Sequence, residues 1–155
     1  MDDDRGRGGG WVVAQFALIV LVLLAPRRGP AWPRGLARLS RLVALPLLAG
    51  GGYLAYRAVD DLGPNLTPFP KPKADAELVR DGAYAIVRHP IYGAIVLLAG
   101  GWALLSASTT RLSCAAGLVA LFQAKAAREE AWLLERFPDY AAYREEVPKL
   151  LPRLW

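Results

Sequence analysis

Cysteine, histidine and methionine are almost absent from this chain, which has one residue of each among its 155. A single cysteine, Cys114, excludes an intrachain disulfide and gives no metal-ligand spacing, so we expect no metal site. The sequence also has no GxGxxG motif after a strand and no alternation of strand and helix patterns. A soluble Rossmann fold is therefore excluded on pattern.

Charged residues are missing from long blocks of the chain. Hydrophobic residues make up 54% of the sequence, and the net charge of +5 comes from basic residues in short connections between apolar runs. This placement favours lipid head groups over nucleic acid as partners. We therefore predict an all-α integral membrane protein. A soluble helical bundle stays as the alternative, since short apolar runs also occur in buried core helices.

Four apolar runs predict about four transmembrane helices, at residues 11–25, 42–56, 91–110 and 112–124. Only the third run reaches the roughly 20 residues of a comfortable span. The others would have to borrow flanking residues, with Arg41, Arg57 and Lys125 reaching to the interface. In the second run, Pro46 and three successive glycines predict a kink or a close helix contact.

Two segments outside these runs carry further signals. The prolines of the loop before the third run predict an extended, helix-free path, and Asp81-Gly82 predicts a turn. After the fourth run, strong helix formers extend the helix by roughly 15 Å, at 1.5 Å per residue, until Pro138 ends it. The short amphipathic tail that follows is expected to lie back on the domain at the interface.

A polar cluster stands at the start of the third run. Pro90 suits the first turn of a helix, where the N–H groups of Ile91, Tyr92 and Gly93 are left without partners. Together with the helix dipole and the Arg88 guanidinium, these donors suit a carboxylate or a phosphate. The alternative is that Arg88 and His89 only anchor the helix end at the head groups.

A second polar cluster, Glu129-Glu130, lies shortly after the fourth run, and its alternative is a solvated helix face. The third and fourth runs predict a helical hairpin joined by "STTR" (108–111), which puts both clusters on the same side of the membrane. The carboxylates can then face the Arg/His anion site across a gap. Such a gap suits a ligand that carries both charges.

Three segments carry a family resemblance: "LTPFPKP", "LVRDGAYAIVRHPIYGAI" and "EEAWLLERFPDYAAYREEVPKLLPRLW". They resemble the isoprenylcysteine carboxyl methyltransferase family, whose relatives include the phospholipid N-methyltransferases. The resemblance covers residues 60 to 155, and RHPxY followed by EE and FPxYxxY is far more specific than any one part. Two N-terminal transmembrane helices (1–58) would then precede a catalytic region (59–155) that holds the hairpin and an interfacial tail.

The resemblance implies a membrane enzyme that transfers the methyl group of S-adenosylmethionine to a lipophilic acceptor, most naturally a prenylated carboxylate of the isoprenylcysteine type. Its cofactor site would lie in the loop before the third helix and the extension of the fourth, facing the cytoplasm. Arg88 and Glu130 would be catalytic. The implied cofactor-binding residues are Tyr84, Arg88, His89, Pro90, Tyr92, Gly93, Glu129 and Glu130.

Three other functions stay open: a phospholipid or amine N-methyltransferase, an NADPH-dependent membrane reductase of the sterol type, and a non-catalytic membrane protein. The acceptor is predicted only as a class of lipophilic molecule, and no oligomeric state is predicted. If the N-terminus, the loop before the third helix and the C-terminal tail are cytoplasmic, that side of the membrane carries 13 of the 19 Lys and Arg residues and the opposite side 6, in line with the positive-inside rule. The first connection, with five arginines, opposes this orientation.

Overall fold

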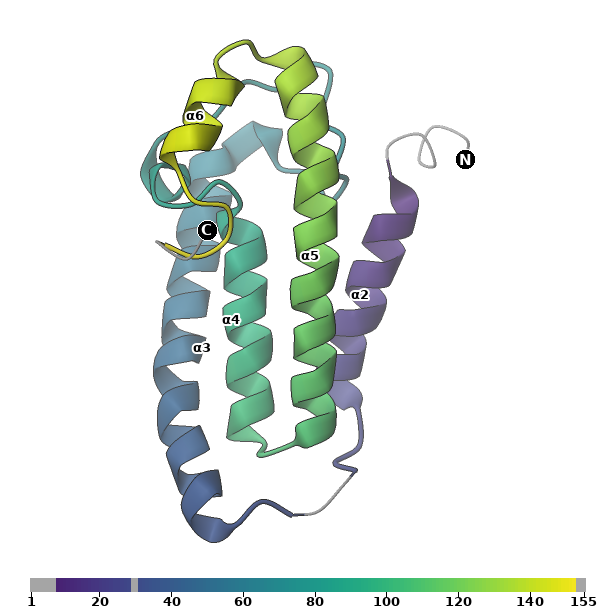
Figure 1. Ribbon diagram of the computed structural model, residues 1–155, viewed down its shortest axis with the longest axis vertical. Coiled ribbons are helices and arrows are strands. Elements are labelled where there is room, and N and C mark those ends of the chain that lie inside the picture. The colour runs from purple at the N-terminus through teal and green to yellow at the C-terminus, as the bar shows by residue number, and fades with distance from the viewer. Residues whose placement is uncertain (1–7, 29–30, 153–155) are drawn as a thin grey trace.

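The computed structural model describes residues 8–28 and 31–152, and the regular structure in these residues is helical throughout (Figure 1). The elements are α2 (Gly9–Leu24), α3 (Arg34–Leu62), η1 (Gly63–Asn65), η2 (Gly82–Ala85), α4 (Pro90–Leu105), α5 (Thr109–Arg136) and α6 (Tyr140–Glu146). The four long helices run up and down side by side, and short α6 lies at the upper end of Figure 1. The predicted all-helical class is confirmed for this part of the chain. Residues 1–7 and 153–155, at the outer ends of the two predicted regions, lie outside the described residues.

One helical segment of the described chain, Arg34–Asn65, is long and apolar enough to cross a membrane; α2 and α4 are shorter apolar helices. The expectation that the third apolar run would give the longest span was wrong. Helix α4 ends at Leu105 after 16 residues, and Ala107 has a φ of 46°. The Ser108 hydroxyl then accepts a hydrogen bond from the N–H of Arg111 and caps α5. Most of the predicted "STTR" connection is therefore the first turn of α5.

Helices α3 and α4 pack closely because glycines face the partner helix. A Cβ on Gly51 would lie 3.0 Å from Leu98 Cγ, and one on Gly101 would lie 2.8 Å from Leu48 Cγ. The close contact predicted for the glycine run is confirmed at Gly51, and α3 continues through Pro46. Small residues let two helix backbones approach in this way in membrane proteins.

The core of the bundle lies where α2, α4 and α5 meet. Its buried members are Val22, Ala99, Ala115, Leu118 and Phe122. One end of the bundle, the upper end in Figure 1, holds the loop 63–89, the start of α4, the second half of α5 and α6. We call this the site end.

The loop and the tail at the site end are tied to the helices. The carboxylate of Asp61, on α3, accepts a hydrogen bond of 2.7 Å from the N–H of Ala83. Gly82 has a φ of 61°, and a side chain there would collide with that carboxylate, so the predicted turn is confirmed and requires glycine. The helix-free path was only partly right, because η1 and η2 form single tight turns within the loop.

The C-terminal tail lies back on the domain, as the sequence predicted. The N–H of Arg88 donates to the carbonyl of Pro148 at 2.9 Å, and that of His89 donates to the carbonyl of Lys149 at 3.0 Å. Tyr140, on α6, is buried. The tail therefore covers the start of α4.

Candidate functional site

Glu130 is the buried centre of an ionic cluster that we call the Glu130 cluster: Arg88, His89, Glu130 and Arg144, of which Arg144 is exposed. Its Oε1 accepts hydrogen bonds from Arg88 Nε at 3.0 Å and from His89 Nε2 at 3.1 Å. Its Oε2 lies 3.5 Å from Arg144 Nε. The Glu130 side chain is only 3% exposed. The cluster thus joins α5 to the start of α4 and to α6.

The ionisation of Glu130 follows from these partners. Burial alone would raise the pKa of its carboxyl. His89 and Arg88 outweigh this effect, each through a hydrogen bond and a positive charge, and the pKa is lowered to about 2. An ionised carboxylate only accepts hydrogen bonds, so Nε2 of His89 is the donor.

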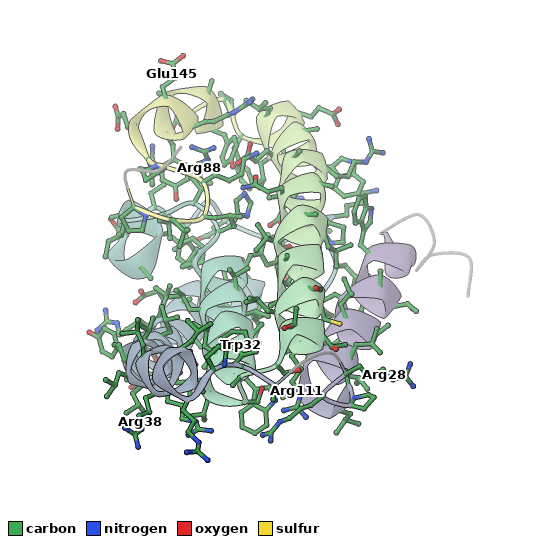
Figure 2. The ribbon with its side chains drawn as sticks, turned by 60° about the horizontal axis from the view of Figure 1, so that its bottom comes forward. Arg28, Trp32, Arg38, Arg88, Arg111 and Glu145 are labelled. Carbon is green, nitrogen blue, oxygen red and sulfur yellow. The ribbon has the colours of Figure 1, made fainter. Side chains whose placement is uncertain are left out.

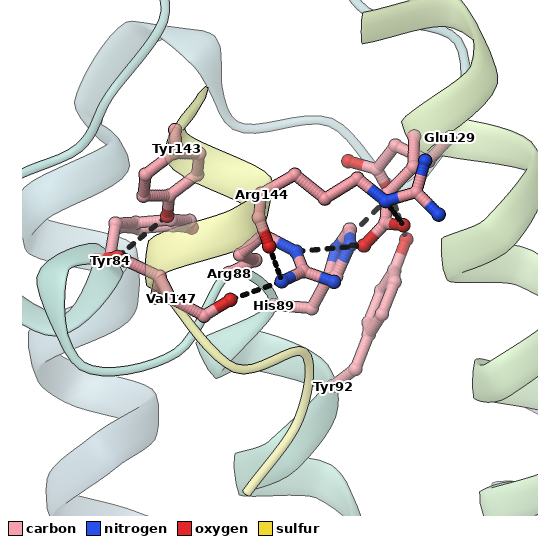
Figure 3. Close-up of polar contacts among 9 residues, drawn as sticks. Tyr84, Arg88, His89, Tyr92, Glu129, Tyr143, Arg144 and Val147 are labelled. Atoms are coloured by element: carbon pink, nitrogen blue, oxygen red, sulfur yellow. Dashed lines mark hydrogen bonds and ion pairs between the residues drawn. The ribbon is translucent and has the colours of Figure 1, made fainter. Parts of the chain in front are cut away.

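Arg88 holds the C-terminal tail as well as Glu130 (Figure 3). Its Nη1 donates to the carbonyl of Arg144 at 2.7 Å and to the carbonyl of Val147. The side chain is only 8% exposed. The sequence predicted an open anion site at Arg88, but most of its donors are used within the protein.

Glu129 has a different environment from its neighbour. Its Oε2 accepts a hydrogen bond of 2.7 Å from the Tyr92 hydroxyl, and its side chain is 25% exposed (Figure 3). Within the described residues, Oε1 of Glu129 has no hydrogen-bond partner. One of the two predicted glutamates is therefore buried in the protein, and the other can still accept hydrogen bonds from a ligand.

A cavity of about 310 Å³ lies beside these residues. It is within the range of roughly 300–1,000 Å³ that is typical of small-molecule sites. Its walls come from α2, the end of α3, the following loop, α4 and α5. The lining residues are Gln15, Leu62, Leu66, Thr67, Pro68, Tyr84, Arg88, His89, Ile91, Tyr92, Lys125 and Glu129.

Five of the predicted cofactor residues line this cavity: Tyr84, Arg88, His89, Tyr92 and Glu129. Glu130, Pro90 and Gly93 are not among the lining residues. A Cβ on Gly93 would lie 2.7 Å from the carbonyl oxygen of Leu150, so the tail occupies the space beside this predicted cofactor residue. The N–H of Gly93 also donates to the carbonyl of His89. Among the described residues, no partner accepts from the N–H groups of Ile91 and Tyr92 at this helix start.

Tyr84 fixes the loop end of the cavity. Its hydroxyl donates to the carbonyl of Ala58 on α3 at 3.4 Å, and its own carbonyl accepts a hydrogen bond of 2.6 Å from the Tyr143 hydroxyl (Figure 3). Burial, followed by the negative charge of Glu129, raises the pKa of Tyr84 above its usual value. The phenol therefore stays neutral and acts as a donor.

Lys125 and Gln15 are site residues that the sequence analysis did not identify. Lys125 was predicted to reach the membrane interface, but it is 1% exposed. Its Nζ donates to Gln15 Oε1 at 2.6 Å and to the carbonyl of Pro68 at 2.9 Å, and lies 5.1 Å from the centre of the Tyr92 ring. No carboxylate of the described residues forms an ion pair with it. Two signals were present: Lys125 stands one turn before Glu129, and Gln15 is the one polar residue of its apolar run.

A second, apolar cavity of about 230 Å³ lies between α2, α4 and α5. Ile19 and Ile95 line it, each one helical turn beyond a residue that lines the first cavity, Gln15 and Ile91. Residues four apart lie on the same face of a helix. The two cavities therefore follow one another along the same faces of α2 and α4.

Comparison with known proteins bears on this arrangement. Residues 39–140 match the family model described as phospholipid methyltransferase. The chain belongs to this family. It is also 34% identical over 113 residues to a protein named protein-S-isoprenylcysteine O-methyltransferase from Schizosaccharomyces pombe (strain 972 / ATCC 24843), an overlap of 70% of this chain and 48% of that protein. The chain thus spans about half the length of this curated relative. The family resemblance noted in the sequence is confirmed.

Proposed function

We propose that this protein is a membrane-embedded methyltransferase that uses S-adenosylmethionine and methylates the carboxylate of a lipophilic acceptor. One observation carries the proposal. In a chain of the phospholipid methyltransferase family, the polar cavity holds Glu129, His89 and the buried cation of Lys125, and an apolar cavity follows it along α2 and α4. The name of the similar yeast protein, an O-methyltransferase of isoprenylcysteine, supports a carboxylate acceptor.

The lining residues fit the chemistry of S-adenosylmethionine. This cofactor has a carboxylate, an ammonium group and two ribose hydroxyls, and when bound it supplies a methyl group for direct displacement by an acceptor. The N–H groups of Ile91 and Tyr92, at the positive end of α4, suit the carboxylate. The unpartnered Oε1 of Glu129 suits the hydroxyls or the ammonium group.

The task of the protein in such a transfer is to position the reactants and to exclude water. A carboxylate acceptor is already a nucleophile, so no general base is required. The Glu130 cluster keeps the tail and the start of α4 in place. It thereby fixes the position of the free N–H groups of α4 and of the His89 ring. We therefore assign Arg88 and Glu130 to positioning, and Glu129 to contact with the cofactor.

Lys125 favours an acid over an amine as the acceptor. A buried cation without a carboxylate partner is costly, and an anionic acceptor would offset that cost. An ammonium group beside Lys125 would be repelled instead. The apolar cavity beyond Gln15 and Ile91 has the character needed for the hydrocarbon part of the acceptor.

We further propose that the site end faces the cytoplasm, where S-adenosylmethionine is made available. Cysteine labelling tests this orientation in a Cys114→Ser background, which removes the native free thiol: in the variant Arg34→Cys, position 34 lies at the end opposite the site. A membrane-impermeant maleimide applied from outside intact cells should label it. Labelling only after the membrane is opened would reverse the orientation.

Cofactor binding tests the core of the proposal. The protein, purified in detergent, should be stabilised against heat by S-adenosylmethionine and by its demethylated product, and not by NADPH. Stabilisation by NADPH alone would instead favour a reductase.

Acceptor choice is tested with Lys125 variants. Lys125→Met should lower the rate with an S-prenylated N-acylcysteine, and Lys125→Arg should retain more of that rate. Arg128→Met, an exposed cation one turn away on α5, is the matched control and should behave like the wild type. Efficient methylation of phosphatidylethanolamine by the wild type would show that the acceptor is an amine.

A further inference from the structure

The end of the bundle opposite the site is strongly basic. We call it the arginine end and define it by six residues: Arg27, Arg28, Arg34, Arg38, Arg41 and Arg111. Figure 2 shows labelled members of this set, with Trp32, at the end away from Arg88 and Glu145. Residues 25–48 and 105–117 contain no Asp or Glu, and the ion pairs of the described chain are all formed elsewhere. Within the described residues, no carboxylate therefore balances the positive charge of this end.

Exposed leucines alternate with the arginines at the start of α3. Leu36, Leu39 and Leu42 are 50%, 58% and 68% exposed, and Arg34 and Arg38 beside them are also exposed. In water the guanidinium groups would be well solvated, but exposure of the leucine side chains to water would be unfavourable. A lipid interface satisfies both kinds of side chain. This surface therefore has the composition of a membrane boundary.

A groove of about 530 Å³ lies at the arginine end, between α2 and α5. Leu18, Cys114 and Gly117 form its apolar part, which reaches toward the middle of the bundle. Arg28 and Thr109 belong to its polar part, with Thr110 and Ser113. The groove thus has an apolar section and a basic, hydroxyl-bearing section.

Hydrogen bonds hold Arg28 beside this groove. Its carbonyl accepts a hydrogen bond of 3.0 Å from the Thr110 hydroxyl. The indole N–H of Trp32 donates to the Thr109 hydroxyl at 2.9 Å. Arg28 and Trp32, which follow α2 in the chain, are therefore both tied to the first turn of α5.

Residues of the groove have donors without an acceptor within the described chain. They are the backbone N–H groups of Thr109 and Thr110, the first two residues of α5, and the guanidinium of Arg28, whose side chain extends outward from the bundle (Figure 2). Guanidinium and helix-start N–H groups together bind phosphate well. The phosphate of a lipid could accept from them while one of its hydrocarbon chains follows Leu18 and Gly117.

We propose that the arginine end binds an anionic phospholipid, with the phosphate at Arg28 and the start of α5 and one chain in the groove between α2 and α5. This lipid site is separate from the cavity at the site end, and it does not depend on the proposed methyl transfer. Its function is to hold α2 in the bundle. Helix α2 contacts α5 from this end up to Lys125.

Native mass spectrometry of the full chain tests the proposal. The protein, taken from nanodiscs of mixed phosphatidylglycerol and phosphatidylcholine, should retain phosphatidylglycerol preferentially. Arg28→Gln should weaken this binding about 5-fold, the equivalent of roughly 1 kcal/mol for one basic residue near a lipid surface. Arg80→Gln, which removes the same charge from an exposed position at the site end, is the matched control and should change nothing.

A second variant distinguishes a lipid from a free phosphate. Gly117→Leu fills the apolar part of the groove without a change of charge, so it should also reduce phosphatidylglycerol binding. Equal retention of both lipids, or equal effects of Arg28→Gln and Arg80→Gln, would overturn the proposal. Full competition by inorganic phosphate, with no effect of Gly117→Leu, would also overturn it, because it would identify a simple anion site.

Discussion

The pairing of Arg88 with Glu130 makes a strong prediction about stability. Each residue contacts the other directly, and both are buried. Removal of one partner from a buried ion pair typically costs about 3–5 kcal/mol. For a chain of this length, 1 kcal/mol corresponds to roughly 2–4 °C in melting temperature, so a single variant should melt about 6–20 °C lower.

The two single variants should not be equally severe. Glu130→Gln leaves three basic groups, those of Arg88, His89 and Arg144, without their shared carboxylate. Arg88→Met leaves Glu130 with two of its three partners. Arg88→Met also frees the tail carbonyls that Arg88 holds, but these are neutral groups, whereas Glu130→Gln removes the carboxylate that three basic groups share. We therefore expect Glu130→Gln to cause the larger loss.

The double variant decides whether the pair acts as a unit. Arg88→Met with Glu130→Gln should be less destabilised than the sum of the single variants, with a coupling energy of about 0.5–3 kcal/mol. Thermal unfolding in detergent without ligand gives the three melting temperatures. The exposed pair Arg80–Asp139, 3.9 Å apart, is the control and should show almost no coupling. Additive losses, or single variants that melt like the wild type, would refute the direct pairing.

Three further predictions concern single residues of the site end. Glu129→Gln should weaken S-adenosylmethionine binding in equilibrium dialysis by about 10- to 150-fold, the effect of losing roughly 1.5–3 kcal/mol at a charged hydrogen bond, while the melting temperature stays near that of the wild type. Because the pKa of Glu130 is lowered from its usual 4.5 to about 2, its stabilising effect is complete above pH 4.5 and is lost as the pH falls to 2. The stability difference between the wild type and Glu130→Gln should therefore shrink over that interval, and a constant difference would argue against an ionised Glu130. Gly93→Ala should displace the tail at Leu150 and make it sensitive to proteolysis, whereas Gly100→Ala, with open space around its Cβ, should not.

Much of the site could be predicted because it depends on local patterns. Two apolar runs joined by a short connection must form a hairpin, and this placed the cluster at His89 and the pair Glu129-Glu130 at the same end. The end of α5 before Pro138 and the turn at Gly82 follow from residue types with few alternatives.

The remaining features depend on contacts that are distant in the sequence. Adjacent residues of a helix point about 100° apart, so only the packed structure shows that Glu130 faces the buried cluster and Glu129 the cavity. The tail that occupies the donors of Arg88 comes from residues almost 60 positions away. Lys125 is buried because Gln15 and Pro68 accept its hydrogen bonds, and no local pattern pairs these three residues.

Transfer of a labelled methyl group tests the proposed activity most directly. The protein in nanodiscs would be incubated with S-adenosylmethionine labelled in its methyl group and with either an S-prenylated N-acylcysteine, its unprenylated counterpart, or phosphatidylethanolamine. We predict label in the prenylated acid alone, as an ester that mild base hydrolyses to labelled methanol, and loss of this product in Glu129→Gln. Label that enters phosphatidylethanolamine and resists base, or equal labelling of the prenylated and unprenylated acids, would contradict a lipophilic carboxylate as the acceptor.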